Sequence, residues 1–274
     1  TFVIAVDDTI KPPTPVVEQT TKLADHARIR LAQLTDAYLD SPGYAGRKFV
    51  ARIVAPSDAS ASKRYPVRVF LHGFGGAPYT GGSSDSFRVY PHDPQNTYWW
   101  GYSDQLPGGD VAEGSVPNYT QRRVLHLIEY VLRTYPGADP GQVYVIGGSM
   151  GGAGAAALGL LYARHFCYAH ATLAQMVPRN HRPSRLAQLS ILWGTPEANV
   201  VDATGMGNWD KGDITRVLRD DIEARNQFIF TKHGKDDTTI HFGAVTIASP
   251  LTKRSFFDVV QQEHTGHHAV WDEG

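Results

Sequence analysis

Apolar and polar residues follow two different patterns along this chain, and the change between them falls near residue 46. In the first segment the apolar positions are four, four, three and four residues apart, at Leu23, Ala27, Leu31, Leu34 and Tyr38. Positions at this spacing share one face of an α-helix, so the pattern predicts an amphipathic helix over residues 20–39. A proline-rich stretch before it and "DSPGYAG" after it are typical of an arm and a turn.

From Gly46 onward, apolar runs of strand length alternate with segments of helical periodicity. Strands are expected at residues 48–56, 65–73, 142–148, 168–175, 227–234 and 267–273. Helices are expected at residues 119–135, 150–166 and 251–263. This alternation predicts an α/β fold, a three-layer sandwich whose mostly parallel central sheet is flanked by helices. We expect a single domain over residues 1–274, with an N-terminal arm and helix over 1–45 and the core over 46–274.

The composition of the 274-residue chain removes several classes of function. Its net charge of −1 gives no electrostatic reason to expect a nucleic acid or an anionic membrane as partner. No apolar run in the sequence is long enough to cross a bilayer. Cys167 is the only cysteine, which excludes an intramolecular disulfide and a cysteine-based metal site. The 12 histidines form no H-E-x-x-H motif, so no metal ion is expected.

The candidate nucleophile is Ser149, in the G-x-S-x-G sequence "GGSMG" at residues 147–151. This sequence directly follows an expected strand and opens an expected helix, which is the context that a nucleophile elbow requires. The turn forces the serine into a strained backbone conformation, and glycines on both sides leave room for it. A phosphate-binding turn is the alternative, but G-x-G-x-x-G is not matched and no acidic ribose partner follows at the usual distance.

A candidate oxyanion loop follows the expected strand at residues 65–73, in "VFLHGFGG". A His-Gly-x-Gly turn at this place supplies one backbone N–H to the oxyanion, and the residue after the nucleophile supplies the other. Phe74 and Met150 are therefore the expected donors, through their main chains only. We expect His72 to hold the loop by hydrogen bonding rather than to act as the base.

The candidate acid is Asp237, at the end of the strand-to-turn sequence "FIFTKHGKDD". A triad carboxylate is expected at the end of a later strand, on the same edge of the sheet as the serine. Asp236 is its neighbour and remains an alternative. Glu197 is another, because "LSILWGTPE" has the same outline. The longer apolar run before Asp237 favours Asp237 over Glu197.

Two tryptophans, Trp99 and Trp100, lie in "NTYWWGYSDQ" after the oxyanion loop. They are candidate substrate-binding residues that would form an aromatic wall of the cleft. Ordinary burial of large aromatic side chains under a loop explains the cluster equally well.

The motifs "FLHGFGG", "VYVIGGSMGGAGA" and "KHGKDD" together resemble the α/β-hydrolase fold. Within it, residues 46–274 resemble the secreted esterase group that includes polyhydroxybutyrate depolymerase-like enzymes and feruloyl or acetyl xylan esterase-like enzymes. The resemblance implies a serine hydrolase of carboxylic esters, with a Ser-His-Asp triad, no cofactor, and a secreted or periplasmic location. The ester could belong to a polyester or a plant polymer. A serine peptidase or amidase, or a catalytically silent binding module, are the alternatives.

The catalytic histidine is the residue that the sequence leaves hardest to place. Ser149 and Asp237 are expected at the carboxyl ends of their strands, and the histidine must lie at the same edge. His264, His267 and His268 precede or begin the strand expected at 267–273, which puts them at the opposite edge, roughly 16 Å away. We therefore expect none of them to be the base. Related sequences tend to carry it after a "WDxG"-like strand end, so the histidine is expected just beyond Gly274, where this chain is cut short.

Overall fold

The computed structural model describes residues 11–79, 81–82, 84–201, 205–221, 224–246 and 261–263. Its main sheet has eight strands in the order β1-β2-β3-β5-β4-β6-β7-β8. In chain order these strands are Val16–Lys22, His26–Leu34, Lys48–Pro56, Tyr65–Leu71, Phe87–Tyr90, Ala138–Gly148, Tyr168–Thr172 and Ile229–Phe230. Neighbouring strands pair in parallel along β5-β4-β6-β7-β8. Along β1-β2-β3-β5 the neighbouring strands pair antiparallel.

A second, short ribbon continues the sheet at the end that carries β8. Strand β9, Lys232–Gly234, follows β8 after one residue and pairs in parallel with β10, Gln261–Glu263. The strand expected at 227–234 is therefore interrupted at Thr231, whose hydroxyl donates to the carbonyl of Ala171 at 2.8 Å.

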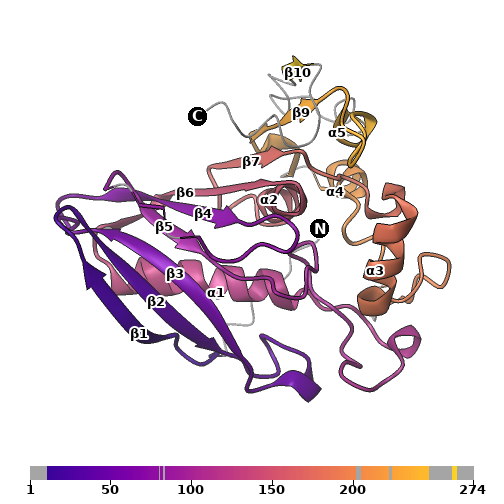
Figure 1. The fold of residues 1–274 in the computed structure, drawn as a ribbon, viewed down its shortest axis with the longest axis horizontal. Helices are drawn as coiled ribbons and strands as arrows, with labels where there is room; N and C mark the ends of the chain where they lie inside the picture. The colour runs from indigo at the N-terminus through magenta and orange to yellow at the C-terminus, as the bar shows by residue number, and fades with distance from the viewer. Residues whose placement is uncertain are drawn as a thin grey trace.

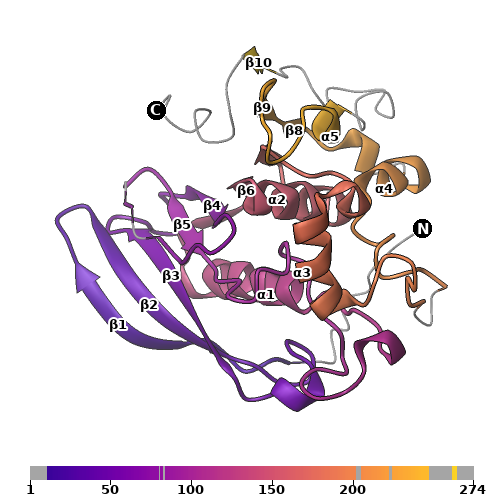
Figure 2. The same cartoon turned by 45° about the vertical axis from the view of Figure 1, so that its right-hand side comes forward.

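Five α-helices lie in the described part of the chain. They are α1 Tyr119–Thr134, α2 Met150–Leu161, α3 Pro183–Trp193, α4 Ile214–Asp220 and α5 Gly243–Thr246. Short 3-10 turns occur at Pro42–Tyr44, Val111–Glu113, Pro178–Asn180 and Ala224–Asn226. Helices α1 and α2 both contact β6, and α3 lies beyond the carboxyl ends of β4 and β7 (Figures 1 and 2). The main apolar core lies between the sheet and the helices α1, α2 and α4.

The predicted helix over residues 20–39 is wrong, because these residues belong to the antiparallel pair β1 and β2. A spacing of four residues returns to the same face of a strand as well as of a helix, so the pattern suits both. Within β2, Ile29 and Leu31 are buried while Arg28 and Arg30 point away from the core, which is strand alternation. All nine residues of β2 pair with β3, and this pairing makes the segment a strand rather than a helix.

The end of the chain also differs from the expectation. Residues 261–263, predicted as the last turn of a helix, form strand β10. The rest of that predicted helix and the strand predicted at 267–273 lie outside the described residues. The strands predicted at 48–56, 65–73, 142–148 and 168–175 and the helices at 119–135 and 150–166 are confirmed, with small shifts at their ends. The molecule therefore has the mostly parallel α/β architecture that the sequence predicts.

Candidate active site

Ser149 occupies the sharp turn between β6 and α2. Its backbone dihedrals are φ 56° and ψ −121°, which a residue with a side chain rarely adopts. Its N–H donates to the carbonyl of Thr172 on β7 at 3.0 Å, and its carbonyl accepts from the N–H of Ala153 at 3.0 Å. A strained non-glycine residue held by bonds on both sides is typical of a functional turn. The serine therefore lies at the carboxyl edge of the parallel strands.

The glycines around Ser149 are required by close packing. A Cβ atom on Gly147 would lie 2.2 Å from the carbonyl oxygen of Gly151. One on Gly151 would lie 2.1 Å from the carbonyl oxygen of Leu71, the last residue of β4. No side chain fits at either distance, so the G-x-S-x-G sequence allows the elbow and the end of β4 to touch.

The candidate oxyanion donors lie on these two touching segments. Met150 is the first residue of α2, and Phe74 belongs to the turn that follows β4. Between the residues that the structure describes, no hydrogen bond to the backbone N–H of Phe74 or Met150 is found. The first N–H groups of a helix lack partners within the helix and attract negative charge. Both groups are thus chemically suited to a developing oxyanion.

His72 holds the oxyanion loop, which confirms its predicted structural role. Its Nδ1 donates to the carbonyl of Gly73 at 2.8 Å, and its Nε2 accepts from the N–H of Asp93 at 3.1 Å. Burial lowers the pKa of His72, so the ring stays neutral and keeps this pair of bonds.

A second loop, residues 93–99, supports the first. The amide oxygen of Asn96 accepts from the N–H of Gly75 at 2.6 Å, and Nε1 of Trp99 donates to the carbonyl of His72 at 3.1 Å. The buried carboxylate of Asp93 accepts from the N–H of Trp99 at 3.1 Å, and burial raises the pKa of Asp93. Asn96 and Trp99 both have positive φ values. The two loops therefore brace each other.

The burial of Trp99 and Trp100 favours ordinary packing under a loop over an aromatic wall of the cleft. Trp99 is 0% exposed and belongs to the main core, where it packs against Gly154 of α2. Trp100 is 6% exposed and packs with Trp193 and Trp209 in a second core cluster. Burial of these large rings stabilises the loop more than an open wall could.

Asp237 follows β9 and is fixed by its own turn. One carboxylate oxygen accepts from the N–H groups of Thr239 and Ile240 at 2.7 and 2.9 Å. The other oxygen lies 3.4 Å from Nε2 of His233. That ring is fully buried, and its Nε2 also lies 2.7 Å from the carbonyl of Ile240, so His233 braces the acid turn. Asp237 is 2% exposed, as a triad acid would be.

The two alternative acids fit the site less well. Asp236 has an exposed side chain, in contrast to the buried Asp237. Glu197 is exposed and follows helix α3, whereas Asp237 follows strand β9. The similar sequences around Glu197 and Asp237 therefore fold differently.

The described chain ends at β10, directly before the three C-terminal histidines. Strand β10 ends at Glu263 and pairs in parallel with β9, with Glu263 beside Gly234. Glu263, the last described residue, therefore lies at the edge where β9 leads into Asp237. His264, His267 and His268 themselves, and the predicted position beyond Gly274, lie outside the described residues.

Helix α3 approaches both loops that flank Ser149. Nη1 of Arg182 donates to the carbonyl of Thr239 in the acid turn at 3.4 Å. The guanidinium of Arg185 stacks on the ring of Phe74, with its central carbon 3.5 Å from the ring centroid. A cavity of about 290 Å³ is lined by Phe74, Asn96, Arg185 and other residues of α3. This cavity adjoins the oxyanion loop.

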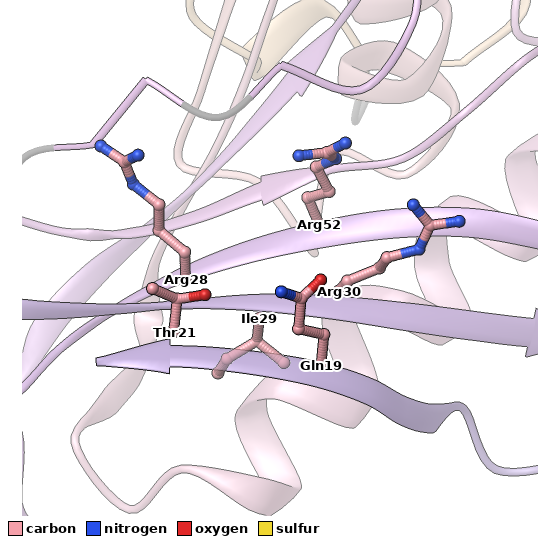
Figure 3. Close-up of a pocket in the computed structure, with 6 residues that line it drawn as sticks. All are labelled: Gln19, Thr21, Arg28, Ile29, Arg30 and Arg52. Carbon is pink, nitrogen blue, oxygen red and sulfur yellow. The ribbon is translucent and has the colours of Figure 1, made fainter. Parts of the chain in front are cut away.

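Another cavity, of about 230 Å³, lies on the antiparallel end of the sheet (Figure 3). Its lining includes Arg28, Arg30 and Arg52, whose side chains project to the same side of β2 and β3 (Figure 3). Arg30 pairs with Glu18 at 2.9 Å. These strands contribute no residue to the elbow, the oxyanion loop or the acid turn, so this cavity is not part of the candidate active site.

Sequence reasoning missed the bracing residues Asp93 and Asn96 and the arginines of α3. The Asp-Pro and Asn residues in "HDPQNT" indicate a turn, but not that it holds the oxyanion loop. Pro183 at the first position of α3 is a usual helix start. Neither signal reveals a contact between segments more than 100 residues apart in the chain, such as Arg185 on Phe74.

The described residues contain neither a candidate metal site nor a membrane-spanning helix. No group of three or more His, Cys, Asp or Glu side chains in this part of the chain is arranged to hold a metal ion. Across the same residues, no helix has the length and apolar character needed to cross a membrane.

Comparison with solved structures supports the same fold. The chain is similar to an S-formylglutathione hydrolase from Agrobacterium tumefaciens, with a TM-score of 0.66, 15% identity and 92% of each chain covered. It is similar to the fluorophosphonate-binding serine hydrolase F of Staphylococcus aureus, with a TM-score of 0.61, 14% identity, and 90% of this chain and 94% of that one covered.

A ferulic acid esterase matches with a TM-score of 0.58 and 17% identity, over 89% of this chain and 92% of that one. No family profile and no curated protein sequence matches the chain. At these identities the likeness establishes the α/β-hydrolase fold.

Proposed function

We propose that this protein is a serine esterase that cleaves carboxylic esters through an acyl-enzyme. The observation that carries the proposal is Ser149 in a positive-φ turn between a parallel strand and a helix, packed against the end of β4. An α/β-hydrolase fold with Asp237 buried at the same edge supports it. So does the likeness to solved esterases and serine hydrolases.

The proposed chemistry uses each part of the site once. Oγ of Ser149 attacks the ester carbonyl, and a histidine accepts the hydroxyl proton as the new C–O bond forms. The N–H groups of Phe74 and Met150 bind the oxyanion of the tetrahedral intermediate. The histidine then gives the proton to the leaving alcohol as the ester C–O bond breaks. Water attacks the acyl-enzyme in the same way, and Asp237 orients the histidine throughout.

We further infer that the base is one of the three histidines that follow β10, namely His264, His267 or His268. The parallel pairing of β10 with β9 brings the chain to the edge of Asp237 one residue before His264. Replacing each histidine singly with alanine should identify the base, since one variant would lose turnover by about 10⁴-fold or more while the others stay near the wild type. In a protein that extends past Gly274, full activity in all three variants would favour a histidine beyond that residue.

Hydrolysis of 4-nitrophenyl acetate and butyrate tests the function directly. Wild-type protein is expected to show saturable turnover that a serine-reactive phosphonate abolishes. A panel of polyesters, feruloylated sugars and peptide amides then decides among polymer-directed esterase, small-ester esterase and amidase. The absence of turnover with every ester would contradict the proposal and favour a binding module. A secreted or periplasmic location stays a prediction.

A further inference from the structure

Arg185 is a buried arginine without an acidic partner in the described part of the chain. The residue is 8% exposed, and no carboxylate of these residues lies within ion-pair distance of its guanidinium. Its guanidinium lies over the rings of Phe74 and Tyr98 and donates a hydrogen bond to the amide oxygen of Gln188. Burying a charge costs free energy unless an opposite charge or several hydrogen bonds compensate it. The site therefore has the chemistry to bind an anion.

The surroundings of Arg185 are basic as well. Arg182 and Arg185 lie at the N-cap and in the first turn of α3, where the helix dipole already disfavours cations. His181, beside them, is 7% exposed, and neither ring nitrogen has a hydrogen-bond partner in the part that the structure describes. Burial and then the charges of Arg185 and Arg182 lower the pKa of His181 to about 3. His181 is therefore neutral near pH 7, and a bound anion would offset the charges of Arg182 and Arg185.

The position of Arg185 connects it to the reaction. Its guanidinium covers Phe74, whose N–H is a proposed oxyanion donor, and it lines the cavity of about 290 Å³ beside that loop. Arg182 reaches the acid turn at Thr239. The start of α3 thus spans from one flank of Ser149 to the other. Stacking on Phe74 uses a face of the guanidinium, and its N–H edges remain suited to the two oxygens of a carboxylate.

We propose that Arg185 binds a carboxylate carried by the ester substrate, so that the enzyme prefers esters with a negatively charged group in the acid or the alcohol half. This inference rests on the proposed esterase function, because the anion is bound next to the oxyanion loop. The volume of the cavity suits a short aliphatic chain between the ester and the carboxylate.

Matched pairs of substrates measure this preference. Monoethyl glutarate carries the charge in the acid half, and its neutral partner is the corresponding monoamide. The anion 3-butyryloxypropanoate carries the charge in the alcohol half, and its neutral partner is 3-butyryloxypropanamide. For one of the two pairs we expect kcat/KM of the anion to exceed that of the amide by about 10- to 100-fold, the usual effect of a hydrogen-bonded charge. That pair identifies the half that is bound.

Three variants separate specificity from support of the loop. Arg185→Gln should bring the ratio of anionic to neutral kcat/KM close to 1, and Arg185→Lys should keep part of it through its charge. Arg216→Gln is the matched control, because Arg216 lies on helix α4 rather than α3 and pairs with Asp210. This variant should leave the ratio of anionic to neutral kcat/KM unchanged. An equal loss on both substrates in Arg185→Gln would mean that Arg185 only supports Phe74, and would overturn the proposal.

Binding to the Ser149→Ala variant distinguishes failure of this proposal from failure of the esterase function. Calorimetric titration with monoethyl glutarate and 3-butyryloxypropanoate should show binding that Arg185→Gln weakens by at least about tenfold. If the wild type cleaves no ester but this Arg185-dependent binding persists, the esterase function fails and the anion site stands. If the wild type cleaves esters without preferring either anion, the anion site is wrong and the esterase function stands.

Discussion

The two ends of the main sheet differ in burial, in strand direction and in chemistry. At one end, β4, β6 and β7 run in parallel, and their apolar residues, such as Val69 and Val145, are 0% exposed. At the other end, β1 pairs antiparallel with β2, and all seven of its residues are exposed. The elbow, the oxyanion loop and the acid turn all follow strands of the parallel end. The antiparallel end contributes no side chain to them.

The difference between the two ends shows that precise geometry is maintained at the carboxyl ends of the parallel strands. Parallel strands bring their carboxyl ends to one edge, so segments far apart in the chain meet there. Glycines at the elbow allow contacts that no other residue permits, and a pair of loops braces the oxyanion donors. An exposed antiparallel ribbon needs neither, and it tolerates substitution accordingly.

Replacement of the nucleophile should give the largest effect. In Ser149→Ala, ester hydrolysis is expected to fall by about 10⁴-fold or more, because no acyl-enzyme can form. The midpoint of urea unfolding should change little, since the backbone bonds of residue 149 to β7 and α2 remain. Turnover above about a hundredth of the wild type would show that the nucleophile lies elsewhere.

The acid turn should give the next largest effect. Asp237→Asn keeps an oxygen for the N–H groups of Thr239 and Ile240 but removes the charge that orients the histidine. We expect kcat to fall by about 10³- to 10⁴-fold. Asp236→Asn, at the exposed neighbour, is the matched control and should stay within about twofold of the wild type. A larger loss for Asp236→Asn than for Asp237→Asn would exchange the two assignments.

The paired tryptophans separate support of the oxyanion loop from ordinary burial. Trp99→Phe removes the N–H that holds the carbonyl of His72, whereas Trp100→Phe removes a bond to Val116 at 3.4 Å, away from the loop. Both should lower the free energy of unfolding by about 1–3 kcal/mol. Only Trp99→Phe should also lower kcat, by about tenfold, because the loop positions the N–H of Phe74. Equal kcat values in the two variants would remove this role for Trp99.

The smallest effect is expected at the antiparallel end. Val17→Thr on β1 should change the free energy of unfolding by less than about 0.5 kcal/mol, since Val17 is 47% exposed. Val145→Thr on β6 buries a hydroxyl without a partner and should cost about 1–3 kcal/mol. Urea unfolding of both variants measures the contrast. Equal losses would mean that β1 carries as much of the packing as the parallel end.

The same contrast explains what could be predicted from the sequence. Apolar runs such as "VYVI" on β6, and the elbow that follows it, indicate both the element and its place, because a buried parallel strand has few alternatives. At β2, the residues Ala27 and Leu31 fit a helix face as well as a strand face, and only pairing with β3 decides.

The candidate site was predictable where a motif is local and not where it depends on contacts across the fold. The strand-to-helix turn at Ser149 and the turn after a strand at Asp237 were predicted from the segments that contain them. The stack of Arg185 on Phe74 and the bond from Trp99 to His72 join separate segments, and no local pattern encodes them. The helix predicted to end at residue 263 was wrong there for a related reason, because only pairing with β9 makes residues 261–263 a strand.

The most direct test is the mass of the intact protein after incubation with a fluorophosphonate, with the modified peptide then mapped. A single adduct on Ser149 is expected in the wild type, in step with loss of ester hydrolysis, and no adduct is expected in Ser149→Ala. An unmodified wild type, or an adduct on another serine, would contradict the assignment of Ser149 as the nucleophile of an esterase.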